Sequence, residues 1–113
     1  MSWNSGLQLR VLEGAQIGLV LPLLDRSVIL GRATAYGEEA DGYMFFYEAT
    51  VSRQHAELRW DDRKATYWLI QKSQTNKTLV DNQKVEVKHP KLVIPGCKIQ
   101  MGLLQLVLET RPF

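Results

Sequence analysis

Arg32, Ser52 and Arg53 are residues whose types and positions could do chemistry. They combine two guanidinium groups with a hydroxyl, at points where apolar runs end or begin. Such side chains cost little in a solvated loop and much in a core, so we expect them at a rim of the fold. Guanidinium N–H groups match the oxygens of a phosphate, and a hydroxyl adds a further short hydrogen bond. If the fold brings the three residues together, the sequence predicts a small site for a phosphate dianion.

The elements that would position these residues are β-strands. Most of the chain alternates apolar and polar residues with a period of two, and no segment shows a helical period. Turn-forming residues separate the runs at intervals of about eight to twelve residues, which predicts an all-β fold, an antiparallel β-sandwich of about 11 short strands. The expected strands lie at 7–11, 17–21, 28–30, 43–46, 56–60, 66–70, 79–80, 85–87, 91–94, 97–101 and 104–108.

The length and patterning indicate one domain. A chain of 113 residues is long enough to form a core without disulfides or a metal ion. It contains no internal repeat, low-complexity tract or linker. We therefore predict a single domain over residues 7–109, with residues 1–6 and 110–113 as flanking termini.

The composition argues against several classes of function. The formal charge of +2, from fourteen Lys and Arg against twelve Asp and Glu, is too balanced to indicate a nucleic-acid partner. The single cysteine, Cys97, excludes an internal disulfide, and no ligand spacing indicates a metal or cofactor site. No apolar run reaches the length of a membrane span, and the N-terminus lacks the features of a signal peptide. We expect a cytoplasmic protein that does not insert into membranes.

Three motifs lie in order at the predicted strand–loop junctions. They are Gly31-Arg32, then Ser52-Arg53-Gln54-His55, then Thr75-Asn76-Lys77-Thr78. Together they resemble the forkhead-associated (FHA) domain, whose pattern is Gly-Arg, Ser-x-x-His and Asn-Gly-Thr on an eleven-stranded, FHA/SMAD-like β-sandwich. The resemblance extends over residues 7–109. It implies a non-catalytic signal-transduction module that binds phosphothreonine in partner proteins, and therefore a Ser/Thr kinase that phosphorylates them.

The resemblance also implies roles for single residues. Arg32 would contact the phosphate, Ser52 would hydrogen-bond to it, and Arg53 would be a second phosphate or peptide contact. Asn76 would bind the peptide main chain, with Thr75 near it. The residues that the resemblance makes structural are Gly31, Thr78 and His55, whose ring would tie the recognition loops together.

Three features of the sequence go beyond the family pattern. Lys77 stands where the family has glycine; it costs about 1 kcal/mol if the position needs a positive φ, or else the turn takes another shape. Cys97 replaces a turn residue and is expected to be small and buried. The acidic residues Glu38, Glu39 and Asp41 are expected to border the peptide groove and to disfavour acidic residues that flank the phosphothreonine.

Two other functions remain open on the sequence alone. An FHA-like scaffold could bind a partner, or itself, independently of phosphate through the aromatic segment 43–47. A hydrolase could use Ser52 and His55 as nucleophile and base, although no motif supplies an acidic third member. Loss of binding in an Arg32→Ala variant would separate the phosphate-dependent module from the scaffold.

Overall fold

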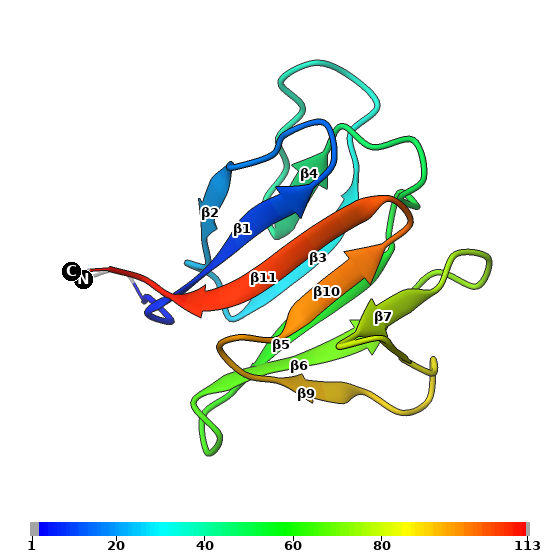
Figure 1. Ribbon diagram of the computed structural model, residues 1–113. Helices are drawn as coiled ribbons and strands as arrows, with labels where there is room; N and C mark the ends of the chain where they lie inside the picture. Colours follow the sequence, from blue (N-terminus) through cyan, green and yellow to red (C-terminus); the bar gives the residue numbers. More distant parts are fainter. Residues whose placement is uncertain (1–2, 113) are drawn as a thin grey trace.

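The computed structural model describes residues 3–112, which form 11 strands and no helix. The strands are β1 (Leu7–Glu13), β2 (Val20–Pro22), β3 (Ser27–Arg32), β4 (Tyr43–Phe46), β5 (Ala56–Asp61), β6 (Thr66–Gln71), β7 (Thr78–Val80), β8 (Gln83–Lys84), β9 (Lys91–Val93), β10 (Lys98–Met101) and β11 (Leu104–Thr110). Two sheets face each other, with strand orders β2-β1-β11-β10-β7-β8 and β4-β3-β5-β6-β9 (Figure 1). The predicted all-β sandwich is confirmed.

The core lies between the sheets and is built from alternate residues of the strands. In β11, Leu104, Leu106 and Leu108 are buried, while Gln105 and Val107 between them are half-buried. This alternation is the physical reason why a period-two sequence forms strands, because successive side chains point to opposite faces. Burying a leucine side chain stabilises the fold by about 2 kcal/mol.

β4 departs from the antiparallel arrangement. It pairs in parallel with β3, so that Tyr43 lies opposite Ile29 and Phe46 lies opposite Arg32. A parallel pair needs a connection that returns along the sheet, and residues 33–42 provide it here. The sandwich is therefore mixed rather than purely antiparallel.

A two-residue turn sets the pairing of β7 with β8. Asp81 and Asn82 have φ values of 48° and 68°, the conformation of a tight hairpin turn whose twist matches the strands. The turn places β8 directly after it, opposite Val80 and Leu79. The strand predicted over 85–87 is therefore wrong: within this described segment only an isolated bridge forms.

The two ends of the described chain meet at the β1–β11 pair. Leu7 lies opposite Thr110, and the N–H of Arg111 donates to the carbonyl of Gly6 over 2.8 Å. The loops 47–55 and 72–77 lie at the other end of the sandwich (Figure 1). Within residues 3–112 no helix is long and apolar enough to cross a membrane.

Candidate functional site

The end of β3 packs tightly against the loop 47–55. A Cβ atom on Gly31 would lie 1.9 Å from the carbonyl oxygen of Arg53, so only glycine permits this approach of two backbones. The backbone N–H of Arg32 donates to the carbonyl of Ser52 over 3.0 Å. These contacts bring Arg32, Ser52 and Arg53 to one rim of the sandwich.

His55 connects the loop 47–55 to the loop 72–77. Its Nδ1 accepts the backbone N–H of Ser52 over 3.1 Å, so the hydrogen of the neutral ring lies on Nε2, which donates to the carbonyl of Lys77 over 3.0 Å. The side chain is buried, and this burial lowers its pKa despite the bond to Lys77. The ring is therefore neutral and holds the two loops in a fixed relation.

Ser52, Ser73 and Asn76 form a hydroxyl–amide cluster between the two loops. The Oγ atoms of Ser52 and Ser73 are 2.9 Å apart, and Asn76 Nδ2 donates to Ser52 Oγ over 2.8 Å. Ser73 Oγ also accepts the backbone N–H groups of Asn76 and Thr75 over 2.9 and 3.3 Å. The cluster therefore holds the Ser52 side chain and the Asn76 amide in place between the two loops.

Buried side chains support the loop 72–77 from below. Gln71 Nε2 donates to the carbonyls of Ser73 and Asn76 over 2.9 and 2.7 Å. The hydroxyl of the fully buried Thr78 donates in turn to Gln71 Oε1. Thr75, by contrast, reaches the cluster only through a 3.5 Å contact with Ser73. Thr78 thus lies in the core, whereas Thr75 lies at the edge of the site.

Arg32 keeps its charge available. Its Nη1 donates to the carbonyl of Val51 over 2.8 Å, and within the described residues its guanidinium forms no ion pair. The side chain is only half-buried. A cation held by the neutral carbonyl of Val51, the residue before Ser52, can receive an anion from solvent.

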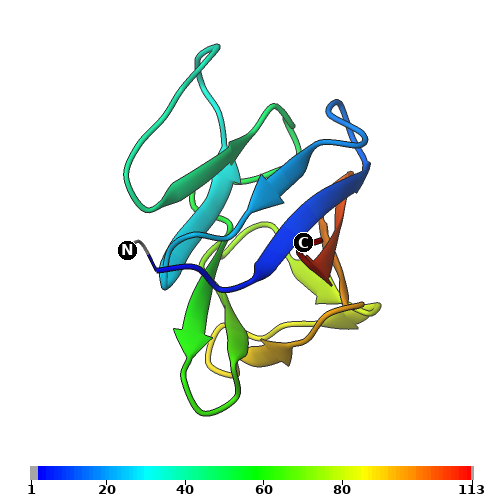
Figure 2. The ribbon, with the colours of Figure 1, turned by 90° about the vertical axis from the view of Figure 1, so that its left-hand side faces the viewer.

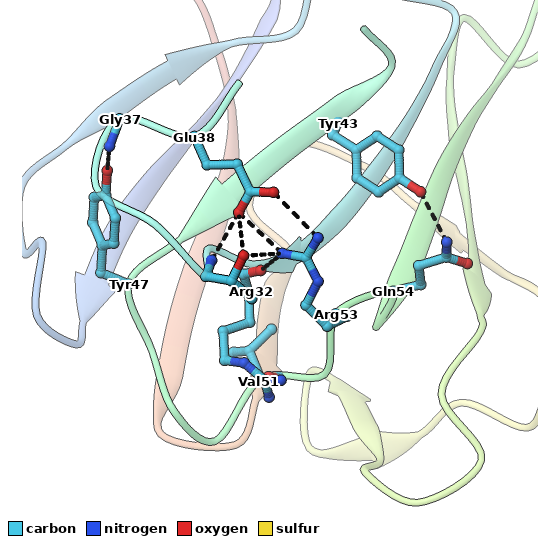
Figure 3. Close-up of polar contacts among 9 residues, drawn as sticks. Arg32, Gly37, Glu38, Tyr43, Tyr47, Val51, Arg53 and Gln54 are labelled. Atoms are coloured by element: carbon cyan, nitrogen blue, oxygen red, sulfur yellow. Dashed lines mark hydrogen bonds and ion pairs between the residues drawn. The ribbon is translucent and has the colours of Figure 1, made fainter. Parts of the chain in front are cut away.

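Arg53 is instead held by a carboxylate. Its Nη1 and Nη2 donate to the two oxygens of Glu38 over 3.0 and 3.2 Å (Figure 3). The guanidinium also donates to the carbonyl of Arg32 over 2.7 Å and lies 5.5 Å from the ring centre of Phe45. The ion pair, with the backbone N–H of Thr34, lowers the pKa of Glu38 to about 2. The sequence resemblance implied that Arg53 contacts the phosphate or the peptide, whereas in the structure its guanidinium is paired with Glu38.

The two departures from the family pattern have simple structural outcomes. In the described chain, the residues other than glycine with positive φ are Ala65, Asp81 and Asn82. Lys77 is not among them, so the turn takes another shape and the cost of a left-handed lysine does not arise. Cys97 is buried as expected, and burial raises the pKa of its thiol.

Sequence reasoning did not assign Ser73 to the site, and it expected Glu38 at the border of the peptide groove but not in an ion pair with Arg53. Ser73 carries a detectable signal, because a serine that bonds the N–H groups two and three residues onward is a common local turn. The Glu38–Arg53 pair carries none, because the separation of the two residues in sequence does not reveal that the β3–β4 connection brings Glu38 to Arg53.

The geometry does not support the hydrolase hypothesis. His55 accepts the backbone N–H of Ser52 rather than its hydroxyl, so it is not placed to take the hydroxyl proton. Within residues 3–112, no three His, Cys, Asp or Glu side chains are grouped to hold a metal ion.

The family profile described as FHA domain matches residues 28–102. The chain is similar to the FHA domain of FhaA, solved in complex with the intracellular domain of Rv3910, at 26% identity and a TM-score of 0.70 over 91% of this chain and 99% of that one. It is also 26% identical, with a TM-score of 0.72 over 95% of this chain and 98% of that one, to a structure from a study of phosphothreonine-dependent FHA domain interactions.

A third structure, the FHA domain of CT664 from Chlamydia trachomatis, shares the fold at 20% identity, with a TM-score of 0.73 over 94% of this chain and 98% of that one. No curated protein matches the chain. The profile match covers the segment that carries β3, both loops and the His55 bridge. The chain therefore belongs to the FHA domain family.

Proposed function

We propose that this domain binds phosphothreonine-containing segments of partner proteins, without catalysing a reaction. FHA domains are protein-interaction modules. One similar structure is a complex with a partner domain, and another comes from work on phosphothreonine-dependent interactions. Those ligands belong to those proteins, so the support within this chain comes from the chemistry of the Ser52 cluster.

The set of hydrogen-bond partners around Ser52 Oγ is the observation that carries the proposal. Ser73 Oγ accepts two backbone N–H groups, which leaves its own hydrogen for Ser52 Oγ at 2.9 Å or for Thr75 Oγ1 at 3.5 Å. We assign this hydrogen to the shorter contact, with Ser52. Ser52 Oγ then accepts hydrogens from both Ser73 and Asn76. With both of its lone pairs used in this assignment, its own hydrogen is left for an acceptor outside the described chain. A phosphate oxygen is an acceptor of this kind.

Arg32 supplies the charge in this proposal. A phosphothreonine brings about −1.5 to −2 charges at neutral pH, and Arg32 lies beside Ser52 without an ion pair in the described chain. The Asn76 Oδ1 atom accepts no hydrogen bond from the described residues, so it is available to a peptide N–H, with Thr75 beside it. Arg53 would contact the phosphate only if its guanidinium left the Glu38 carboxylate.

The test is a titration with a degenerate phosphothreonine peptide pool and with the same pool dephosphorylated. Arg32→Ala and Ser52→Ala should each weaken binding of the phosphorylated pool by about ten- to a hundred-fold, because each removes a charge-assisted hydrogen bond. Arg63→Ala, which removes an exposed arginine in the β5–β6 turn, is the matched control. Equal binding of both pools, or wild-type affinity in Arg32→Ala, would contradict the proposal.

The proposed function also implies a kinase and a location in the cell. Phosphothreonine implies a Ser/Thr kinase that modifies the partner, and we place the domain in the cytoplasm, where such kinases act. The FhaA domain offers a parallel, because the partner in its complex is an intracellular domain.

A further inference from the structure

A groove of about 810 Å³ lies between strands β2 and β4. Each of these strands ends its own sheet, and both face the viewer in Figure 2. The apolar wall of the groove is formed by Leu21 of β2, by Leu24, and by Met44 and Phe45 of β4. Leu24 is 50% exposed. None of the residues proposed above to bind the phosphopeptide lines the groove.

The polar part of this β2–β4 groove carries negative charge only. Asp25, Glu38, Glu39 and Asp41 line it, and no lysine or arginine does. Glu38 is paired with Arg53, but within the described chain the other three carboxylates form no ion pair. In a chain whose formal charge is +2, this is a local reversal of sign, and it favours a cationic partner.

We propose that the β2–β4 groove docks an extended, unphosphorylated segment of a partner protein in which basic and apolar residues alternate. Edge strands present backbone N–H and C=O groups that an extended segment can pair with. Apolar side chains of that segment would pack on Leu24 and Met44. Its lysine or arginine side chains, whose stems are long and apolar, would lie along the wall and place their charges at Glu39 and Asp41.

This inference does not depend on phosphate recognition. The groove and the Ser52 cluster share no lining residue, and the docked segment needs no modification. A partner that carries both a phosphothreonine and a basic–apolar segment would bind at two places at once, and the second contact would then be intramolecular.

The probe is a short synthetic peptide in which lysine alternates with valine and leucine, and its twin has glutamate in place of lysine. Titration followed by backbone amide NMR should show binding of the lysine peptide alone, with shifts at Leu21, Leu24 and Met44. Leu24→Ser and Glu39→Lys should each weaken binding by about three- to ten-fold, because one removes apolar contact and the other a favourable charge.

Matched controls separate the groove from general attraction. Leu103→Ser removes a leucine that is 67% exposed elsewhere, and Glu13→Lys reverses an exposed charge outside the groove; both should bind like wild type. Arg32→Ala should also leave this peptide's affinity unchanged, although it weakens phosphopeptide binding. Equal binding of the glutamate twin, no binding of the lysine peptide, or equal losses in the control variants would overturn the inference.

Discussion

Glu38 holds the guanidinium of Arg53 through both carboxylate oxygens. The carboxylate, the Thr34 hydroxyl and the Phe45 ring surround Arg53, so a phosphate would have to compete with a carboxylate that is already in place. With the pKa of Glu38 lowered to about 2, the carboxylate is ionised throughout the physiological pH range. Arg53 could therefore bind a phosphate only if the phosphate displaced the Glu38 carboxylate.

Replacing Glu38 should strengthen phosphopeptide binding. Glu38→Gln removes the charge that holds Arg53 and competes with a phosphate for it. We expect the affinity for a phosphothreonine peptide to rise about two- to five-fold, which is the size of effect typical of an exposed ion pair. The gain should disappear in the Glu38→Gln, Arg53→Ala double variant. Calorimetric titration of the four combinations measures this coupling.

The control for that cycle is Glu39→Gln. It removes the same charge from the next residue in the chain, whose side chain forms no ion pair in the described chain. If Glu39→Gln raises the affinity as much as Glu38→Gln, the effect is one of net charge, and the Glu38–Arg53 pair plays no special part.

His55 should make the fold sensitive to mild acid. Because its pKa is lowered by burial, the unfolded chain binds a proton below about pH 6.5 that the folded chain does not bind. The free energy of unfolding should therefore fall as the pH is lowered from 7 toward 5. Urea denaturation at a series of pH values measures the slope.

The second histidine provides the control for this prediction. His89 is exposed, so His89→Gln should retain the slope, whereas His55→Gln should lose it and be less stable at pH 7. Protonation of carboxylates with lowered pKa, such as Glu57 and Glu109, reduces the free energy of unfolding only in more acidic solution. An unchanged slope in His55→Gln would contradict the assignment.

The residues that we propose for the site were chosen from the sequence because of their chemical type and their place at strand ends. The structure brings Arg32, Ser52 and Asn76 into contact through backbone and side-chain hydrogen bonds. The sequence did not reveal whether each of these side chains is already bound to another group of the chain. Whether an arginine is available or already paired depends on where a distant carboxylate such as Glu38 lies, and local patterns do not encode that distance.

At the scale of elements, the β3 strand depends on one glycine. Gly31→Ala would place a Cβ atom 1.9 Å from a backbone oxygen, and backbone cannot move aside as a flexible side chain can. We expect a loss of at least about 3 kcal/mol in the free energy of unfolding, measured by urea denaturation.

Gly37→Ala is the matched variant for this prediction. Gly37 has a positive φ of 73° and open space around it, so alanine should cost only about 1 kcal/mol of conformational strain. Similar losses for the two substitutions would mean that close approach of the backbones is not what requires glycine in β3.

The elements that the sequence predicted well are those whose apolar runs are bounded by turn residues. The hairpin of β5 and β6 and the strand at 43–46 appear where expected, although the four residues of β4 are all apolar or aromatic and do not alternate in burial. The direction of β4 was not predictable, because a period of two is the same for parallel and antiparallel pairs. β8 escaped detection because both of its residues are exposed, and only the turn conformation at Asp81 and Asn82 sets its position.

At the scale of the whole molecule, stability depends on strands outside the family match. A fragment of residues 28–102 would lack β1, β2 and β11, and with them three fully buried leucines of β11. We expect this fragment to be unfolded, because one sheet would lose three of its strands and the remaining sheet would expose its core face. Circular dichroism and amide NMR, compared with residues 7–110, measure the difference.

The result for the longer fragment also bears on the domain limits that we propose, residues 7–109. Residues 7–110 should unfold cooperatively with urea. A folded 28–102 fragment, or an unfolded 7–110 fragment, would show that the chain distributes its stability differently from the sandwich described here.

The pairing of Leu7 with Thr110 gives the molecule the geometry of a removable module. Paired residues on adjacent antiparallel strands lie about 5 Å apart, so Leu7 and Thr110 lie at nearly one point, at the end away from the loops 47–55 and 72–77. Spliced into a surface loop of a carrier protein, the domain would hardly stretch that loop and would present the proposed site outward. A circular permutant, with Gly6 and Arg111 joined and new ends opened at the exposed Arg63–Lys64 turn, should keep the same site.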